Sequence, residues 1–230
     1  MKICYLLPGI GMPPAEKLRR QAVLNTVTGG GTTVEVHQVA DGPLAIENAI
    51  DEYKAMPQVL DFIIKNQANF DGFIIGCAGD SGLEGAREQS KKPVVGPGES
   101  SILLGAIGDK RFSMITISSE RARMKRRLVR ESGLDEHRLI SSHTLDTHVL
   151  DLHGDPRKSM PGLIAAMKEA KAKGAEVMLV GCMTVAFMDP ALLGEAMDAT
   201  GLKLINPIVA AVKLAEALVT LDAYGRAPVK

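Results

Sequence analysis

Tryptophan is absent from the sequence, and aromatic residues make up only 3% of it. Proteins that bind single-stranded nucleic acid stack the bases on aromatic side chains, so few such platforms are available here. A net charge is absent too, because 27 basic residues balance 27 acidic ones. Nucleic acids and anionic membranes attract a sustained positive surface, and this balance argues against both as partners.

Long apolar runs are also missing. None approaches the roughly 20 residues that a membrane-spanning helix needs. The N-terminal stretch Met1–Pro8 is too short for a signal peptide and predicts a buried first strand. Cysteine is scarce: Cys4, Cys77 and Cys182 are widely spaced and form no disulfide framework and no CxxC motif. We therefore expect free thiols in the reducing cytoplasm.

Short apolar runs alternate with longer amphipathic stretches, and this pattern is typical of a parallel sheet covered by helices. The predicted strands are Lys2–Leu7, Val34–Gln38, Gly72–Gly76, Val94–Gly96, Arg111–Ile117, Arg138–Ser142, Val177–Gly181 and Leu204–Asn206. The predicted helices are Ala15–Thr26, Ala45–Asn69, Gly82–Ser90, Ser100–Ile107, Glu120–Ser132, Pro161–Lys173, Pro190–Thr200 and Ile208–Leu221.

An internal repeat divides these strands into two sheets. The segment Phe73–Cys77 is followed by a helix and then by Pro93–Pro97, and Met178–Cys182 is followed by a helix and then by Lys203–Pro207. The order strand, Gly-Cys, helix, strand, Pro, helix therefore occurs twice. We predict an α/β fold of two Rossmann-like three-layer halves, each with a short, mainly parallel four-stranded sheet. A pseudo-twofold axis relates the halves, and the active site lies between them.

The predicted boundaries follow from this repeat. Residues 1–97 form the first half and residues 98–207 the second, while the C-terminal helix, 208–230, packs back on the first half. In open parallel sheets, ligands bind beyond the carboxyl ends of the strands. Cys77 and Cys182 lie at two such ends. We expect the two cysteines to face each other across one cleft.

A facing pair of cysteines suits the inversion of a carbon acid. Such a reaction needs a base on one face of the stereocentre and an acid on the other. A thiol has a pKa of about 8.5 and can serve in either role near neutrality. Backbone N–H groups at the start of a helix would stabilise the thiolate, and each cysteine precedes a predicted helix. The same groups could hold a substrate carboxylate or an enolate oxygen.

The alternative is that these cysteines are small core residues, as most cysteines after apolar runs are. The repeat favours function, because two unrelated core cysteines need not occupy equivalent strand ends. Cys4 has no such context, since it lies inside the first strand, and we assign it to packing.

The residues around both cysteines resemble a known family. The segments that carry the resemblance are Gly76–Leu83, Lys92–Gly96, Val180–Met183 and Ala210–Leu218. They are similar to hydantoin racemases, which belong to the aspartate/glutamate racemase superfamily. The resemblance implies two Rossmann-like halves, a proton shuttle between Cys77 and Cys182, and no metal or organic cofactor.

The resemblance also implies residues that hold the substrate. Family members use the positions after each cysteine and a threonine that ends the first strand of the second half; here these are Gly79, Asp80, Met183, Thr184 and Thr116. Ala78 replaces a bulky family residue and would widen the pocket.

Other positions depart from the family. The first loop, Pro8–Pro13, has no polar side chain where the family has an Asn-Pro-Asn type of sequence, and Met183-Thr184-Val185 replaces Ala-Gly-Met. Gly9 and Gly11 lack the third glycine of a dinucleotide-binding loop, but they would let a ligand approach the backbone closely. Two roles stay open for Glu99: orienting a substrate N–H group, or capping a helix as a purely structural acid.

Two further clusters favour ordinary surface roles. The histidines His143, His148 and His153 recur near Asp146, Asp151 and Asp155, but their five-residue spacing suits a solvated loop better than a metal site. A basic run follows a helix cap at Ser118–Glu120, and we expect a solvated helix face rather than a phosphate site. Its members are Arg121, Arg123, Lys125, Arg126, Arg127 and Arg130.

The sequence thus predicts a cofactor-independent racemase with Cys77 and Cys182 as its acid/base pair. A 5-substituted hydantoin or an allantoin-like compound is the favoured substrate. An aspartate, glutamate or other amino-acid racemase is the alternative, as is a related isomerase or decarboxylase. A non-enzymatic ligand-binding module is less favoured. The expected partner is a small molecule, with a homo-oligomer expected by analogy with relatives.

Overall fold

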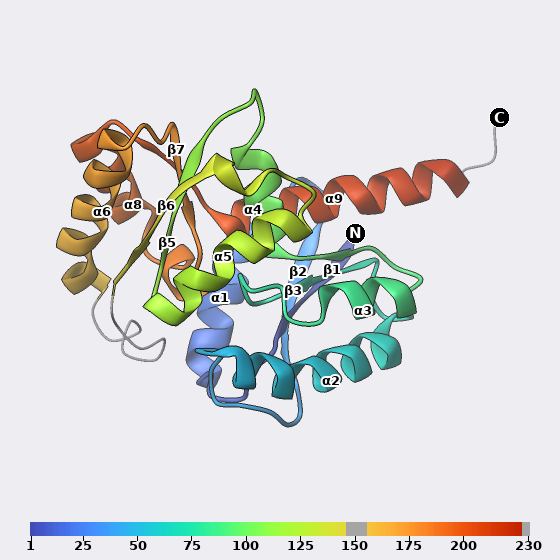
Figure 1. The fold of residues 1–230 in the computed structure, drawn as a ribbon. Coiled ribbons are helices and arrows are strands. Elements are labelled where there is room, and N and C mark those ends of the chain that lie inside the picture. The colour runs from blue at the N-terminus through green and yellow to red at the C-terminus, as the bar shows by residue number, and fades with distance from the viewer. Residues whose placement is uncertain (146–155, 227–230) are drawn as a thin grey trace.

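Two parallel sheets form the centre of the computed structural model, which describes residues 1–145 and 156–226 (Figure 1). The first sheet contains β1 (Lys2–Leu7), β2 (Thr33–Gln38), β3 (Gly72–Ile75) and β4 (Val94–Val95). The second contains β5 (Phe112–Thr116), β6 (Leu139–Thr144), β7 (Val177–Val180) and β8 (Lys203–Ile205). The strand orders are β2-β1-β3-β4 and β6-β5-β7-β8, so the two halves repeat one topology. The predicted fold of two four-stranded parallel sheets is confirmed.

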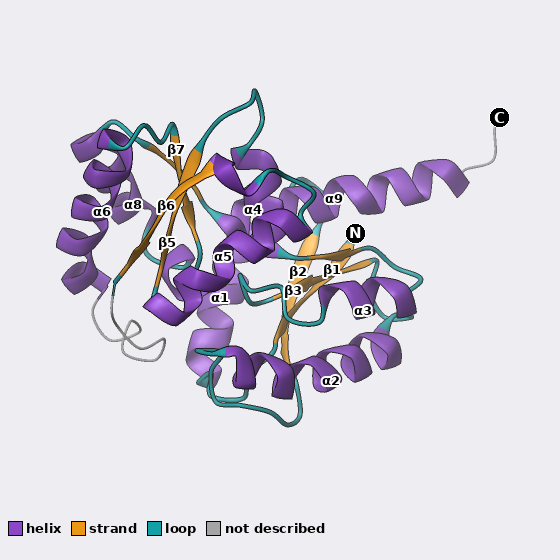
Figure 2. Ribbon diagram, in the orientation of Figure 1, coloured by secondary structure: helices purple, strands orange, loops and turns teal. Residues whose placement is uncertain are grey.

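Helices connect the parallel strands and cover the sheets (Figure 2). In the first half of the chain they are α1 (Pro14–Thr26), α2 (Ala49–Asn66), α3 (Leu83–Gln89) and α4 (Pro97–Gly105). In the second they are α5 (Ser119–Glu131), α6 (Met160–Ala172), α7 (Met183–Ala186), α8 (Pro190–Thr200) and α9 (Pro207–Arg226), with short 3₁₀ turns at Glu136–Arg138 and Pro156–Ser159. Among the described residues, no helix is both long enough and apolar enough to cross a lipid bilayer.

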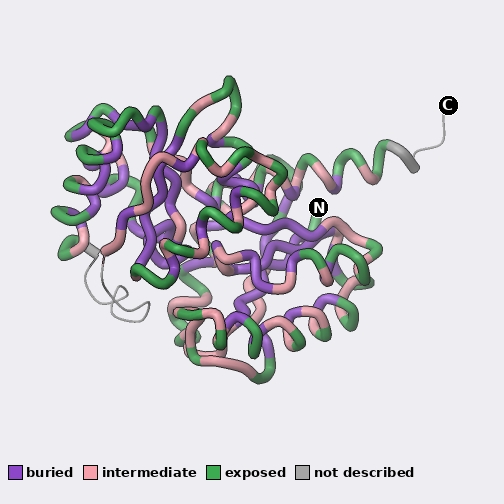
Figure 3. The backbone as a smooth tube through the Cα atoms, in the orientation of Figure 1, coloured by how far each residue is buried: buried purple, intermediate pink, exposed green. Residues whose placement is uncertain are grey.

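The sheets are buried on both faces, as all-parallel sheets generally are. Ile3–Leu6 in β1 and Phe73–Ile75 in β3 have no exposed surface, and β7 is almost as deeply buried. The tube in Figure 3 shows this burial along the central strands and exposure along the outer faces of the helices. Uninterrupted apolar runs were therefore a reliable signal for these strands.

The last helix of each half packs on the sheet of the other half. Helix α4, which follows β4, packs against β7 and β8, while α9, which follows β8, packs against β3 and β4. The two helices also pack against each other. Glycines allow the close approach at both places: Gly105 of α4 lies against Leu179 of β7, and Gly72 of β3 lies against Val219 of α9. A pseudo-twofold relation produces such a reciprocal exchange.

The predicted boundary between the halves, residues 1–97 and 98–207 with 208–230 returned to the first, stays a prediction. An exchange of helices between two sheets does not by itself define where one unit ends. Helix starts differ from prediction in two places. Helix α2 begins at Ala49 rather than Ala45, because Asn48 and Asp51 form a capping box. Helix α4 begins at Pro97, a residue whose fixed φ suits a first helical position.

Substitution of Ile102 tests the packing of α4 on the second sheet. Ile102 is fully buried in a cluster with Phe112 and Leu179, whereas Leu104 on the same helix is 39% exposed. We expect Ile102→Ala to lower the free energy of unfolding by about 2–5 kcal/mol, because the cavity it leaves is only partly filled. Leu104→Ala should cost less than about 1 kcal/mol. Urea unfolding of both variants measures the difference, and equal losses would contradict this packing.

Candidate active site

Cys77 and Cys182 occupy equivalent places in the two sheets. Cys77 follows β3 by two residues, and Cys182 follows β7 by the same interval. Strand β3 pairs with β1 and β4, and β7 pairs with β5 and β8, so each cysteine leaves a central strand at its carboxyl end. Both cysteines line a single cavity of about 80 Å³. The cavity is bounded by residues from both halves of the chain.

The lining of the cavity is mainly apolar. Its described residues are Leu7, Pro8, Gly9, Met12, Arg20, Leu44, Ala45, Ile46, Gly76, Cys77, Ala78, Gly79, Thr116, Ile117, Arg121, Gly181, Cys182, Met183 and Thr184. Six of the nine predicted substrate-binding positions line the cavity: Gly9, Ala78, Gly79, Thr116, Met183 and Thr184. Gly11, Asp80 and Glu99 do not. The position of these residues does not test whether they bind a substrate.

The turn after β3 surrounds the sulfur of Cys77. The backbone N–H of Gly79 donates to Cys77 Sγ at 3.4 Å. Burial raises the pKa of the Cys77 thiol, while Arg121, the Gly79 N–H group and Lys125 act to lower it and Glu52 adds to the rise. The helix predicted to begin after this cysteine starts only at Leu83. The turn from Cys77 to Gly82, rather than a helix N-terminus, therefore supplies the N–H donor.

Cys182 has a different local structure. It is the N-cap residue of α7, a single-turn helix that the sequence patterns did not predict. Only 8% of Cys182 is exposed, and the next residues, Met183 and Thr184, are also buried. The N–H groups in the first turn of a helix lack intrahelical partners. Cys182 is thus closer to a helix start than Cys77 is, although the two cysteines end equivalent strands.

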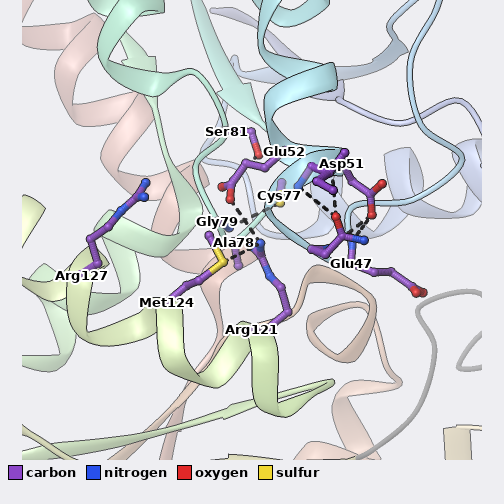
Figure 4. A network of polar contacts seen from close by, with 12 residues as sticks. Glu47, Asp51, Glu52, Cys77, Ala78, Gly79, Ser81, Arg121, Met124 and Arg127 are labelled. Carbon is purple, nitrogen blue, oxygen red and sulfur yellow. Dashed lines mark hydrogen bonds and ion pairs between the residues drawn. The ribbon is translucent and has the colours of Figure 1, made fainter.

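A buried ion pair joins the two halves beside Cys77. Arg121 Nη1 of α5 lies 3.3 Å from Glu52 Oε2 of α2, and both side chains are almost fully buried. Figure 4 shows the Arg121 guanidinium pointing toward Glu52, with Cys77, Ala78 and Gly79 close by. Gly79 has no room for a side chain, because a Cβ there would overlap Arg121 and lie 2.8 Å from Glu52 Oε1. A side chain at residue 79 would therefore have to displace this ion pair.

The expectation of a solvated basic face on α5 is wrong for two residues. Arg121 is 4% exposed and Lys125 is 2% exposed, whereas Arg123 is largely exposed. Lys125 Nζ donates to the carbonyl oxygen of Ala78 at 2.9 Å. Arg121 and Lys125 are four residues apart and share one helix face, which packs against the cysteine turn of the other half. Their four-residue spacing places them on one face, but Arg123 and Arg127 have the same spacing, so the sequence does not show which face is buried.

A second buried arginine lies on the Cys182 side. Arg20 of α1 is 2% exposed, pairs with Glu16 at 2.9 Å and donates to Thr184 Oγ1 at 3.3 Å. Its guanidinium lies over the Phe187 ring, 4.5 Å from the ring centre, which is a favourable cation–π contact. Arg20 thereby holds the segment after Cys182 against α1. Arg20 could not be identified from the sequence, because an isolated arginine in an amphipathic helix gives little signal.

Thr116 borders the cavity and has a buried hydroxyl. Thr116 ends β5, lines the cavity and is 1% exposed. Its Oγ1 finds no hydrogen-bond partner among the described residues. An unpaired buried hydroxyl is costly, so a bound ligand that pairs with it would gain free energy.

Asp80 and Glu99 make structural contacts away from the cavity. The two Asp80 carboxylate oxygens accept from the N–H groups of Gly98 at 2.8 Å and Glu99 at 2.6 Å, which caps α4. Burial raises the pKa of the Asp80 carboxyl above its ordinary value. The Glu99 carboxylate pairs with Arg87. Two roles were left open for Glu99. Its contacts are those of the structural role, in the first turn of a helix.

The first loop contacts a second loop that lies over the cavity. Ile10 N donates to the carbonyl of Pro43 and Gly11 N to that of Leu44, both at 2.9 Å. A Cβ on Gly11 would lie 2.6 Å from the Leu44 carbonyl oxygen, so the glycine permits this contact. Leu44, Ala45 and Ile46 then line the cavity. Ala45 and Ile46 were missed because the sequence predicted that the helix begins at Ala45, and Leu44 was missed because it directly precedes that helix.

The histidine cluster lies partly outside the described residues, which exclude His148, His153, Asp146, Asp151 and Asp155. His143 is not in a solvated loop as expected: it lies in β6, is 9% exposed, and its Nε2 is 2.8 Å from Ser141 Oγ. Burial lowers its pKa. Within residues 1–145 and 156–226, no three His, Cys, Asp or Glu side chains are grouped as metal ligands. Cys4 is fully buried in the core, as predicted.

Comparison with known proteins identifies relatives of the whole chain. A family model described as "Asp/Glu/Hydantoin racemase" matches residues 16–215. A hydantoin racemase from Pseudomonas sp. (strain NS671) is 37% identical over 182 residues, which cover 78% of this chain and 71% of the relative. An allantoin racemase structure from Klebsiella pneumoniae has 28% identity and a TM-score of 0.83, covering 96% of this chain and 88% of that one. An allantoin racemase from Pseudomonas fluorescens shares the fold, with 23% identity and a TM-score of 0.86 over 96% of this chain and 92% of that one.

Glu52→Gln tests the ion pair between the halves. Removing one charge of a buried pair leaves the other uncompensated, so we expect the free energy of unfolding to fall by about 3 kcal/mol. Asp61→Asn is a matched control on α2, because Asp61 pairs with Lys65 at the surface, where such pairs contribute little. Urea unfolding measures both variants. A Glu52→Gln protein as stable as Asp61→Asn would show that the buried pair does not support the fold.

Proposed function

The chain belongs to the Asp/Glu/hydantoin racemase family, and from this premise we propose that it inverts 5-substituted hydantoins by proton transfer between Cys77 and Cys182, without a cofactor. The observation that carries the proposal is the cavity itself. Two cysteines from equivalent strand ends, one in each half, line the same cavity. An enzyme that removes a proton on one face and returns one on the other needs two such groups on opposite sides of its substrate.

The proposed reaction balances in two proton transfers. The thiolate of one cysteine takes the proton from C5 of the hydantoin ring, and the electron pair left behind is delocalised into the adjacent carbonyl as an enolate. The thiol of the other cysteine then gives its proton to the opposite face of C5. The product is the other enantiomer, and the two cysteines have exchanged protonation states. The reverse reaction restores the original states.

The polar groups of the cavity suit a neutral ring. A hydantoin carries carbonyl oxygens and N–H groups, which the Thr116 hydroxyl and the Thr184 hydroxyl could bind. Thr184 Oγ1 already accepts from Arg20, so its own proton remains to be donated. We propose that these hydroxyls and the backbone of Gly79 and Met183 position the ring between the two sulfur atoms.

The charges of the cavity favour this substrate over a free amino acid. Among the described lining residues, the cations are Arg20 and Arg121, and each is paired with a carboxylate, Glu16 and Glu52 respectively. The carboxylate of aspartate or glutamate would compete with these pairs for a cation. A hydantoin needs no cationic partner, because the carboxyl carbon of the amino acid is an uncharged carbonyl of the ring.

The cysteine variants test the chemistry. In D2O, we expect Cys77→Ala and Cys182→Ala each to lower racemisation of a 5-substituted hydantoin at least about 100-fold, because each removes one acid/base group. Each variant keeps one base on one face, so each should still exchange the C5 proton of one enantiomer with retention. The two variants should favour opposite enantiomers. Proton NMR follows the loss of the C5 signal, and chiral chromatography follows inversion.

The control for these variants is Cys4→Ala. Cys4 is a buried core cysteine outside the cavity, so a folded Cys4→Ala protein should keep the racemase activity. Exchange that persists in the Cys77→Ala/Cys182→Ala double variant would show that other groups carry out the proton transfer. Absence of exchange with every hydantoin tested would refute the proposed activity itself.

The lining also predicts which 5-substituents are preferred. Met12, Leu44 and Ile46 present apolar side chains to the cavity, and none offers a side-chain hydrogen bond. The ureido group of allantoin has several donors and an acceptor that would be left unpaired against them. We expect kcat/KM for a 5-isobutyl hydantoin to exceed that for allantoin by at least about tenfold. Racemisation rates measured by polarimetry test this, and Leu44→Asn should narrow the gap; a preference for allantoin would contradict the assignment.

A further inference from the structure

One buried cation lies between the two cysteine segments. Lys125 Nζ donates to the carbonyl of Ala78, the residue after Cys77. On its other side, a Cβ placed on Gly181 would lie 3.0 Å from Lys125 Cε and 3.5 Å from Nζ. Gly181 is the residue before Cys182. A single lysine side chain therefore contacts the backbone next to both cysteines.

Lys125 does not contact the cavity in which the substrate is proposed to bind. It borders instead a separate cavity of about 10 Å³, shared with Glu52, Gly79 and Arg121 on the far side of the cysteine turn. Because Lys125 is not among the residues that line the substrate cavity, we expect any contribution to the reaction to act through the cysteines.

The charged groups around Lys125 leave its charge uncompensated by a direct ion pair. Arg121 and Glu52 pair with each other, and the carboxylate oxygens of Asp80 accept from the N–H groups of Gly98 and Glu99. Among the described residues, no carboxylate forms an ion pair with Lys125. Burial and Arg121 lower the pKa of Lys125, whereas Cys77, Asp80 and Cys182 act to raise it. Both cysteines therefore interact electrostatically with this one ammonium.

A two-base racemase has a particular need that this arrangement meets. Its negative charge lies on one sulfur before turnover and on the other afterwards. A cation beside only one cysteine would favour one of these states and slow the return. A cation between the two cysteine segments stabilises both states, and burial strengthens its effect because the local dielectric is low.

We infer that Lys125 is a positioning residue whose ammonium is the shared counter-charge for whichever cysteine is the thiolate. The inference rests on the proposed two-cysteine function. In contrast, Arg121 lines the cavity, and the Gly79 N–H group donates to Cys77 alone. Arg121 is paired with Glu52, whereas Lys125 lies beside the residue after Cys77 and the residue before Cys182.

The test measures thiolate formation at each cysteine without any substrate. Wild-type protein and variants are alkylated with iodoacetamide across a range of pH, and mass spectrometry of the peptides gives separate rates for Cys77 and Cys182. We expect Lys125→Met to slow alkylation of both cysteines at least about tenfold at pH 7, because the thiolate is the reacting form. The pH profile of each should move to higher pH. The neighbouring carboxylates of Asp80 and Glu52 remain in place in every variant.

Three further variants separate charge from structure. Lys125→Gln retains a donor for the Ala78 carbonyl but no charge, so it should behave like Lys125→Met; it also replaces that variant if Lys125→Met does not fold. Lys125→Arg retains the charge and should recover the wild-type profiles. Arg123→Met removes a cation from the same helix at an exposed position and should leave both profiles unchanged.

Two results would overturn the inference. Unchanged profiles in a folded Lys125→Gln protein would show that the lysine only supports the turn. A shift confined to one cysteine would show that the charge is not shared. Failure of racemisation in the D2O experiment would refute the proposed function but leave these alkylation profiles interpretable, so the two proposals fail separately.

Discussion

The site depends on the burial of two cations from α5 against the cysteine turn of the other half. Moving a guanidinium and an ammonium out of water costs several kcal/mol each unless partners replace the water. Glu52 from α2 pairs with Arg121, and the Ala78 carbonyl accepts from Lys125. These partners belong to the first half and the cations to the second, so the halves can close only in the register that brings them together. The same register brings both cysteines to one cavity.

The reciprocal exchange of α4 and α9 makes that register rigid. Because each helix packs on the opposite sheet, neither half can rotate without breaking its contacts with the other's terminal helix. Asp80 links this exchange to the site: it lies three residues after Cys77, and its carboxylate caps the first turn of α4. The turn that carries Cys77 is therefore held at two points: Lys125 binds the Ala78 carbonyl, and Asp80 binds the first turn of α4. A two-base mechanism requires such fixed geometry, because a displacement of the order of 1 Å can lower a rate about 100-fold.

Much of this could be predicted from the sequence, and the exceptions have physical reasons. Buried parallel strands are continuous apolar runs, so the strands, the repeat and the equivalence of Cys77 and Cys182 were visible in one dimension. Which side chains of α5 are buried was not, because Arg121 and Lys125 resemble their exposed neighbours until α2 and the Ala78 turn are placed beside them. Leu44–Ile46 were missed for a related reason. The loop ends at the Asn48 cap, but the apolar residues of the loop continue the apolar pattern of the helix, so the helix was predicted to begin too early. The family resemblance implies that Asp80 holds substrate. That its carboxylate caps α4 could not be predicted, because only the fold brings α4 beside the cysteine turn.

The equivalence of the two cysteines in topology does not extend to their surroundings, and thermodynamics limits what that asymmetry can do. Cys77 receives a hydrogen bond from the N–H group of a turn, whereas Cys182 caps a short helix. Enantiomers have equal free energies in water, so the equilibrium constant of a racemase is one and kcat/KM must be equal in both directions. Unequal surroundings can therefore change kcat and KM for each enantiomer only in proportion. The shared counter-charge proposed for Lys125 would stabilise both protonation states, which suits a reaction that runs in both directions better than a stronger charge beside one cysteine would.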